Sequence, residues 1–262
     1  MNRIETTFAN LKEKGEKAFI SYVCAGDPSF DISLEVIKGL ANSGADIIEL
    51  GVPFSDPLAD GIVNQMAASR ALEAGMSTPR VLDLVREFRK THDTPIVLFT
   101  YLNPIFAYGY QQFIKDAQSA GVDGVLILDL PPEEAAQNQD LTIDSGLCHI
   151  TLIAPTTPED RVKLLAESSS GFIYALSRTG VTGANVEPSK AIGSTISKIQ
   201  SYTNVPVCVG FGISTADHAR EQAQHADGVI VGSAIVKQIE KNPNNAVNAV
   251  LEFAKPLIAA VK

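Results

Sequence analysis

Short runs of apolar, β-branched residues recur along the whole chain and alternate with longer segments of helical period. The runs that predict strands cover residues 18–24, 47–51, 96–100, 124–128, 149–153, 172–176, 207–210 and 228–231. The helical segments lie at 32–43, 79–90, 111–120, 133–145, 158–167, 191–201, 216–224 and 246–261. Strands that are apolar throughout are typical of a sheet buried on both faces, so the alternation predicts parallel strands joined by helical crossovers.

Eight such strand–helix units in 262 residues predict an α/β fold, a single (β/α)8 TIM barrel that spans residues 1–262 as one domain. An extra N-terminal helix at 4–14 is expected to close the bottom of the barrel, and an extra short helix is expected near strand 8. The alternative is an open doubly wound sheet. That fold usually carries a GxGxxG turn after its first strand, where this chain has AGDP.

The charge balance and the cysteines narrow the class of protein. Lys and Arg number 21 against 30 Asp and Glu, a formal charge of −9, which disfavours a nucleic-acid partner. No apolar run approaches the roughly 18 residues of a membrane span, and the N-terminus has no signal-peptide pattern. The three separated cysteines, without CxxC spacing, predict reduced thiols and a cytoplasmic protein.

Two carboxylates follow one another on the second strand and its loop. Glu49 lies inside an apolar run, and the alternation of side chains makes it point opposite to Ile48 and Leu50. A buried carboxylate is costly unless it is used or paired, and burial raises its pKa toward the range that suits proton transfer. Asp60 stands in a loop shaped by two prolines. The pair predicts acid–base chemistry at the barrel mouth; the alternatives are a satisfied buried glutamate and a turn aspartate.

Glycine-rich loops follow the last three strands, at 177–183, 210–214 and 232–236. The last of them opens a helix, so its amides point outward at a helix N-terminus. Loops after strands 7 and 8 with a short helix form the common phosphate site of barrels. Together the three loops predict a phosphorylated small-molecule ligand held by backbone N–H groups.

The residues that several other reactions require are not found at the predicted mouth of the barrel. No lysine stands at the end of a strand, which disfavours a Schiff-base aldolase. The histidines fall before strands 3 and 5 and on the seventh helix, so no metal site is expected. No nucleotide fingerprint is present. The chemistry is therefore expected to depend on carboxylates and fixed dipoles.

Four segments are similar to the signature segments of tryptophan synthase alpha chains: ELGVPFSDPLADG at 49–61, LSRTGVTG at 176–183, GFGIS at 210–214 and GSAIVK at 232–237. The first segment is highly specific, whereas the glycine-rich loops alone fit several phosphate-binding barrels. The resemblance runs from the first helix to the last. It implies a lyase of L-tryptophan biosynthesis that cleaves indole-3-glycerol phosphate into indole and glyceraldehyde 3-phosphate.

The resemblance also implies a role for individual residues. The acid–base glutamate of the family falls on Glu49 and its indole-ring aspartate on Asp60. The phosphate-binding positions fall on Gly183, Gly212, Gly232 and Ser233. The indole-pocket positions fall on Tyr22, Phe99 and Tyr174, and a loop-closure threonine that contacts the aspartate falls on Thr182.

This chain departs from the usual family pattern near those positions. The family commonly has Pro-Val/Thr-Ile-Gln after the Asp-Gly pair, where this chain has Ile62, Val63, Asn64 and Gln65. Cys24 replaces the usual threonine. Tyr22 and Phe99 stand where the family often has Phe and Leu. These changes affect the shape of the pocket and the stiffness of the loop, while both carboxylates are kept.

The resemblance implies no cofactor in this subunit. It implies a beta-subunit partner that carries pyridoxal phosphate, in an alpha2-beta2 heterotetramer. Docking is expected through two long mouth-side loops, 53–60 and 178–189, which could instead be lids that serve this subunit alone. Two other functions stay open: an activating subunit with weak activity of its own, and another phosphate-binding barrel enzyme such as a neighbour in the indole pathway or a triose-type isomerase.

Overall fold

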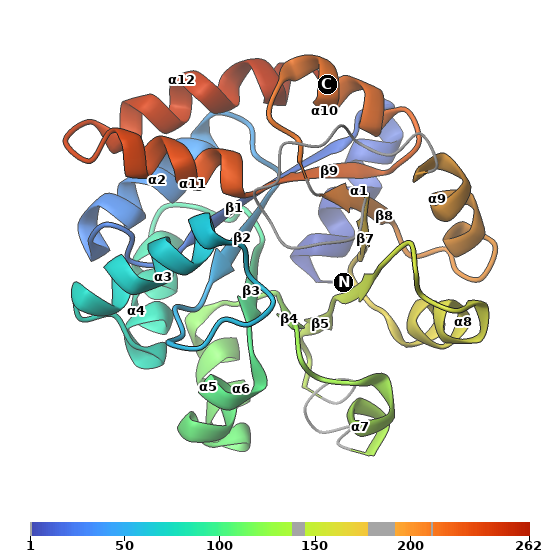
Figure 1. The fold of residues 1–262 in the computed structure, drawn as a ribbon, viewed down its shortest axis with the longest axis horizontal. Helices are drawn as coiled ribbons and strands as arrows, with labels where there is room; N and C mark the ends of the chain where they lie inside the picture. Colours follow the sequence, from blue (N-terminus) through green and yellow to red (C-terminus); the bar gives the residue numbers. More distant parts are fainter. Residues whose placement is uncertain (1, 138–144, 178–191, 211) are drawn as a thin grey trace.

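The computed structural model describes residues 2–137, 145–177, 192–210 and 212–262, and it shows parallel strands surrounded by helices (Figure 1). The strands in these ranges are β1 (Ala18–Cys24), β2 (Ile47–Gly51), β3 (Ile96–Thr100), β4 (Gly124–Ile127), β5 (Cys148–His149), β6 (Thr151–Ile153), β7 (Ile173–Leu176), β8 (Val207–Gly210) and β9 (Gly228–Val231). Every pairing between neighbouring strands is parallel, as the uninterrupted apolar runs predict.

The helices of the described ranges lie outside the strands. They are α1 (Arg3–Lys14), α2 (Phe30–Asn42), α3 (Ile62–Glu73), α4 (Thr78–Arg89), α5 (Leu102–Tyr108), α6 (Tyr110–Ala120), α7 (Pro132–Gln137), α8 (Glu159–Ser168), α9 (Ile192–Gln200), α10 (Ala216–Ala223), α11 (Ser233–Lys241) and α12 (Ala246–Ala259). The predicted extra helices are confirmed: α1 precedes the first strand, and α11 directly follows the last one.

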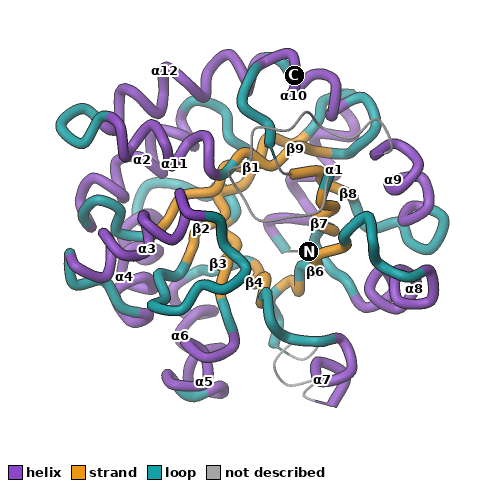
Figure 2. Tube along the Cα trace, in the orientation of Figure 1, coloured by secondary structure: helices purple, strands orange, loops and turns teal. Residues whose placement is uncertain are grey.

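The predicted (β/α)8 barrel is confirmed. The sheet runs in the order β5-β4-β3-β2-β1-β9-β8-β7-β6, and only Ile150 separates its two end strands in the sequence. The fifth barrel strand is thus split in two. Its first part pairs with β4 and its second with β7, so the strands run round a common axis (Figure 2).

The interior of the barrel is filled by alternate residues of the strands. Ile20 of β1, Ile47 of β2 and Val97 of β3 belong to one buried apolar cluster, and α1 contributes Phe8 to it from the bottom. The ring centroids of Phe8 and Phe172 lie 6.1 Å apart. The bottom of the barrel is therefore a packed core, which leaves the carboxyl ends of the strands as the place for polar chemistry.

The sequence analysis missed two helices and misplaced some boundaries. It gave no helix at α3 or α5. The buried face of α3 includes small residues, Ala67, Ala68 and Ala71, which give a weak periodic signal, and α5 has only 7 residues.

The predicted strand 124–128 ends one residue earlier, and the predicted strand 149–153 begins at Cys148 and is interrupted. Of the predicted helix 133–145, α7 covers 133–137, and 138–144 lie outside the described residues. Across the described ranges, no helix is long and apolar enough to cross a membrane.

Candidate active site

Glu49 lies near the carboxyl end of β2 and is 1% exposed. In the sheet register it stands beside Tyr22 of β1 and Val97 of β3, so it points into the barrel. The alternation predicted that it points opposite to Ile48 and Leu50 but not which of the two faces this would be. Its Oε1 atom is buried and has no hydrogen-bond partner among the described residues. Burial, followed by the charge of Asp60, raises the pKa of Glu49 to about 8. The side chain is therefore protonated at neutral pH.

Asp60 follows β2 and has a donor on each carboxylate oxygen. The hydroxyl of Tyr101 donates to Oδ2 at 2.8 Å, and the side-chain amide of Asn64 donates to Oδ1 at 3.2 Å. Burial raises the pKa of Asp60, and the hydrogen bonds from Tyr101 and then Asn64 oppose that rise. These donors favour the ionised carboxylate, so the two acidic groups differ in environment: Oε1 of Glu49 has no partner among the described residues, whereas both oxygens of Asp60 accept hydrogen bonds.

Aromatic side chains lie beside the two carboxyl groups. The rings of Tyr22 and Phe99 meet edge to face, with centroids 5.1 Å apart. Burial raises the pKa values of Tyr22 and Tyr174, and the charges of Glu49 and Asp60 raise them further. The three predicted pocket residues, from β1, β3 and β7, therefore share the interior of the barrel with the acidic pair.

Glycines on neighbouring strands make room for the tyrosine hydroxyls. A Cβ atom at Gly51 would lie 2.5 Å from the hydroxyl oxygen of Tyr22, and one at Gly210 would collide with the hydroxyl of Tyr174. A side chain at either glycine would displace a ring from the pocket. The shape of this apolar region thus depends on Gly51 and Gly210 as well as on the aromatic residues.

The loops after β8 and β9 present backbone rather than side chains. Gly212 has a φ of 77°, a conformation that favours glycine. Gly232 precedes the first residue of α11, Ser233, and the N-terminus of this helix has no side-chain cap. Since β8 and β9 pair, these positions follow adjacent strands. The other two loop positions of the prediction, Thr182 and Gly183, lie outside the described residues.

Comparisons with known proteins agree with this arrangement. The family model described as tryptophan synthase alpha chain matches residues 8–262. The chain is 47% identical to the tryptophan synthase alpha chain of Desulfatibacillum aliphaticivorans, with 100% of both chains covered. It is 49% identical to that of Geobacter sp. strain M21, covering 92% of this chain and 90% of the relative.

A solved structure is similar over the whole length. The alpha subunit of tryptophan synthase from Legionella pneumophila strain Paris superposes with a TM-score of 0.89 at 36% identity, covering 100% of this chain and 98% of the other. The chain belongs to the tryptophan synthase alpha chain family. It is a carbon–carbon lyase of tryptophan biosynthesis, and its reaction is the cleavage of indole-3-glycerol phosphate to indole and glyceraldehyde 3-phosphate.

Two residues of this alpha chain that contact Asp60 were not predicted. Tyr101 directly follows β3, a position at the mouth that could have singled it out. Asn64 is in the first turn of α3, four residues after Asp60, and this spacing has meaning only once the helix is recognised. Both residues lie on segments that the strand–helix pattern left as loops.

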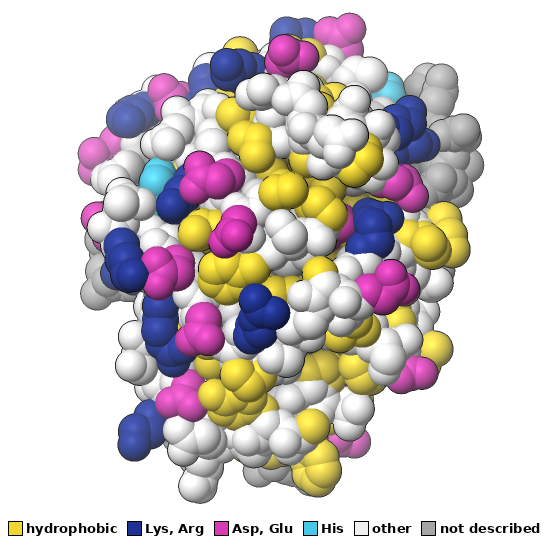
Figure 3. Space-filling view, turned by 90° about the vertical axis from the view of Figure 1, so that its left-hand side faces the viewer, with side chains coloured by type: hydrophobic (Ala, Val, Ile, Leu, Met, Phe, Trp, Pro, Cys, Tyr) yellow, Lys and Arg dark blue, Asp and Glu magenta, His cyan; other side chains and the backbone are white. Residues whose placement is uncertain are grey.

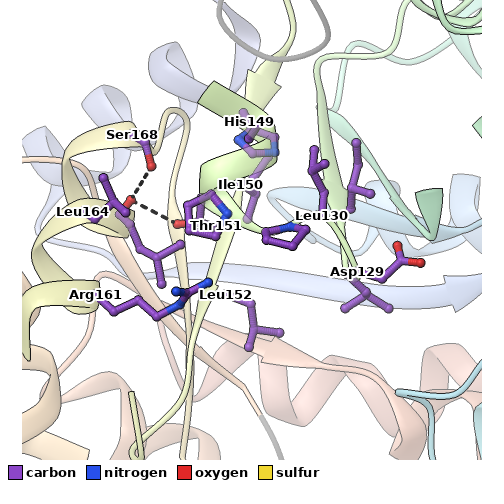
Figure 4. Close-up of a pocket in the computed structure, with 15 residues that line it drawn as sticks. Asp129, Leu130, His149, Ile150, Thr151, Leu152, Arg161, Leu164 and Ser168 are labelled. Carbon is purple, nitrogen blue, oxygen red and sulfur yellow. Dashed lines mark hydrogen bonds between the residues drawn. The ribbon is translucent and has the colours of Figure 1, made fainter. Parts of the chain in front are cut away.

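A separate cavity of about 370 Å³ lies between α7, α8 and the split fifth strand (Figure 4). Its lining is mainly apolar, and neither carboxylate of the predicted site contributes to it. His149 lines this cavity from within β5, the first part of the strand predicted at 149–153. Burial lowers the pKa of His149 to about 4, so the ring is neutral at physiological pH. Among the described residues, no group of three or more His, Cys, Asp or Glu side chains could hold a metal ion.

Proposed function

We propose that Glu49 transfers the protons of the cleavage and that Asp60 stabilises the positive charge that develops on the indole ring. One observation carries the assignment: two carboxyl groups of one strand–loop unit are buried together, burial raises the pKa of both, and hydrogen-bond donors oppose that rise at Asp60. A group protonated near neutral pH suits a general acid, and a hydrogen-bonded carboxylate suits charge stabilisation.

The first step protonates the indole ring. The carboxyl group of Glu49 donates its proton to C3, a C3–H bond forms, and the ring becomes an indolenine with positive charge at N1. The Asp60 carboxylate faces that charge. This protonation is needed because a bare C3 carbanion is a poor leaving group. Each acid–base step of this kind typically contributes about 10²- to 10⁴-fold to the rate.

The second step breaks the bond between C3 and the glycerol carbon. The Glu49 carboxylate accepts the proton of the hydroxyl on that carbon, the oxygen forms the aldehyde, and the bonding electrons return to the ring. N1 becomes neutral, indole leaves, and glyceraldehyde 3-phosphate remains. Glu49 ends the cycle protonated, so the same side chain serves as acid and then as base.

The late loops are proposed to hold the phosphate. Its ligands are the backbone of Gly212 and Gly232, Ser233 at the start of α11, and Gly183 of the sixth loop. A helix N-terminus and glycine amides attract an anion without a cationic side chain. Tyr22, Phe99 and Tyr174 are proposed to enclose the indole, and Thr182 to meet Asp60 when the loop closes. Binding at the phosphate then orients the ring against the carboxyl groups.

A beta subunit is the proposed partner, as the family name implies, and a cytoplasmic alpha2-beta2 complex with pyridoxal phosphate on the beta chain is the proposed assembly. Exposed apolar side chains follow β2 and β3: Leu58 is 89% exposed and Phe106 is 69% exposed. Beside them a hollow of about 450 Å³ is lined by residues such as Phe54 and Pro104. Figure 3 views the side that carries α3 and α4 and shows hydrophobic groups between charged ones. Apolar groups at a mouth favour a protein partner.

The substitution Glu49→Gln tests the assignment of the acid. The amide cannot donate the C3 proton, so turnover should fall by at least about 10³-fold. Glycerol 3-phosphate should still bind as to the wild type, which would show that the fold and the phosphate site are intact. Turnover above a tenth of the wild-type value would contradict the role of Glu49.

A separate experiment tests the partner. Cleavage is measured with and without the cognate beta subunit, and subunit affinity with and without glycerol 3-phosphate. Linkage requires a ligand that orders the mouth to tighten the complex as well. A low intrinsic rate restored by the beta subunit would favour the activating-subunit interpretation. Absence of a complex at micromolar concentration would make the chain a free-standing lyase.

A further inference from the structure

We propose that Asn64 is a positioning residue for the cleavage, because its side-chain amide fixes the Asp60 carboxylate in the orientation and charge that the indole nitrogen requires. The proposal rests on the proposed role of Asp60.

The contact is short-range and buried. Asn64 is 6% exposed, and its Nδ2 atom lies 3.2 Å from Oδ1 of Asp60. Tyr101 donates to the other oxygen at 2.8 Å. With one donor on each oxygen, the carboxylate cannot rotate without losing a hydrogen bond. Asn64 and Tyr101 come from different segments, so together they clamp the plane of the carboxyl group.

The helix that carries Asn64 is itself held in place. Arg70 of α3 forms two hydrogen bonds of 2.8 Å each with Asp27, a carboxylate that is fully buried after β1. At the other end of the helix, Gln65 Nε2 donates to the backbone oxygen of Asp60 at 2.8 Å. A bidentate arginine–carboxylate pair gives geometric precision as well as energy. The amide of Asn64 is therefore presented to Asp60 from a fixed support.

Stability alone does not account for an asparagine at this place. Its Oδ1 atom is buried and has no hydrogen-bond partner among the described residues. An unsatisfied buried acceptor destabilises the folded state, and an apolar side chain of similar size would not bury one. A polar residue kept at such a cost, with its donor aimed at a catalytic carboxylate, is expected to serve the site.

Among the described residues, the other groups that interact electrostatically with Asp60 supply no positive charge. They are Glu49 of β2, Tyr22 and Cys24 of β1, Tyr174 of β7, and Tyr101 before α5. Burial raises the pKa of Asp60, and in the described part of the chain the hydrogen bonds from Tyr101 and Asn64 oppose that rise. Removing Asn64 should raise that pKa again. The pH below which Asp60 is protonated, and cleavage is lost, should then move upward.

The test is the pH dependence of kcat/KM for the cleavage. Asn64→Leu keeps the approximate volume, and Asn64→Ile is a second apolar replacement that removes the amide. In each variant the acid limb of the profile should move up by about one pH unit, since a hydrogen bond to a charged group is worth about that much. The alkaline limb, set by Glu49, should stay near its wild-type position. Asn64→Asp should move the acid limb further, because it adds a negative charge.

Gln65→Met is the matched control. It removes a hydrogen bond from the same helix to the backbone of Asp60 but leaves the carboxylate untouched, so it should lower Tm without moving the acid limb. An unmoved acid limb in both folded Asn64→Leu and Asn64→Ile would overturn the inference. If neither folds, failure of Asn64→Asp to move the limb would do so.

Asp60→Asn separates this inference from the proposed function. If that variant keeps wild-type turnover, the role of Asp60 fails and the inference fails with it. If Asp60→Asn is impaired while the Asn64 variants keep the wild-type profile, only the positioning role is wrong.

Discussion

The two sides of the barrel present different parts of the chain at the mouth. After β2 and β3 the mouth is built from side chains, with Asp60 clamped between Asn64 and Tyr101. After β8 and β9 it is built from backbone, with Gly212 in a left-handed conformation and Gly232 before an uncapped helix. Proton transfer needs groups whose pKa burial can adjust, whereas holding an anion needs only amides at fixed angles. The comparison suggests that substitutions can change proton transfer and phosphate binding separately.

Among the described residues, the early side also carries more inserted helices. Two helices, α3 and α5, are inserted at the mouth after β2 and β3. Of the two donors to Asp60, Asn64 lies on α3 and Tyr101 directly precedes α5. The exposed apolar group Leu58 lies in the loop before α3, and Phe106 lies on α5. On the late side, α11 is the addition that directly follows its strand. Substitutions after β2 and β3 are therefore expected to change mainly kcat. Substitutions after β8 and β9 are expected to change mainly KM.

After Glu49→Gln, the largest effect on turnover is expected from Asp60→Asn. The amide keeps the shape but loses the negative charge, so kcat should fall by about 10²- to 10³-fold, as for other removed charge-stabilising groups. KM should change little. Steady-state kinetics of the isolated chain measure both. Asp56→Asn, on the exposed part of the same loop, is the control and should retain wild-type kcat. If Asp60→Asn changes KM more than kcat, the assignment of kcat effects to the early side is wrong.

Glu49→Gln should stabilise the fold in a pH-dependent way. The pKa of Glu49 is raised from 4.5 to about 8 in the folded chain. When a pKa is higher in the folded chain than in the unfolded chain, the group contributes fully to stability below its unfolded pKa. This contribution is lost as the pH rises toward and through its folded pKa. The free energy of unfolding of the variant should therefore gain about 3 kcal/mol on the wild type between about pH 5 and pH 8.

Denaturant titrations at several pH values give this difference. The exposed control Glu252→Gln should show a flat difference over the same range. A flat difference for Glu49→Gln as well would mean that Glu49 is ionised in the folded protein, and the general-acid role would lose its physical basis.

Gly212→Asp should act on substrate binding. A carboxylate beside the phosphate repels it, so KM should rise by about tenfold or more while kcat changes less. Gly212→Asn is the matched control, because it has the same shape without the charge and both residues tolerate a positive φ better than most. Its KM should rise far less. Equal effects of the two variants would assign the change to crowding rather than to charge.

The smallest expected quantity is the coupling between the two sides. For the double variant Asp60→Asn with Gly212→Asp, we compare activation free energies calculated from kcat/KM. The changes caused by the two single substitutions should add to within about 0.5 kcal/mol, as for independent sites. Kinetics of the wild type, both single variants and the double variant close the cycle. A larger coupling would show that phosphate binding orders the early side, and the mouth would then act as one unit.

Much of this site could be predicted from the sequence because its signals are local. Glu49 stands out as a charge inside an apolar strand, and the glycine-rich loops stand out by composition. Tyr101 and Asn64 did not stand out. A tyrosine after a strand and an asparagine in a weakly periodic segment are common, and neither gives a sign of its partner. The split of the fifth strand at Ile150 was equally invisible, since the apolar run continues through it.

The sequence by itself determined the parallel barrel, the orientation of Glu49 opposite to Ile48 and Leu50, and the position of the glycine-rich loops after the late strands. These depend on periods of two and about 3.6 residues, which are properties of neighbours along the chain. Only the tertiary structure decided which donors reach Asp60. Tyr101 is 41 residues away from it, and the two meet because β2 and β3 pair in one particular register. Such a contact depends on how the whole barrel closes, because the register fixes which side chains face one another across the mouth.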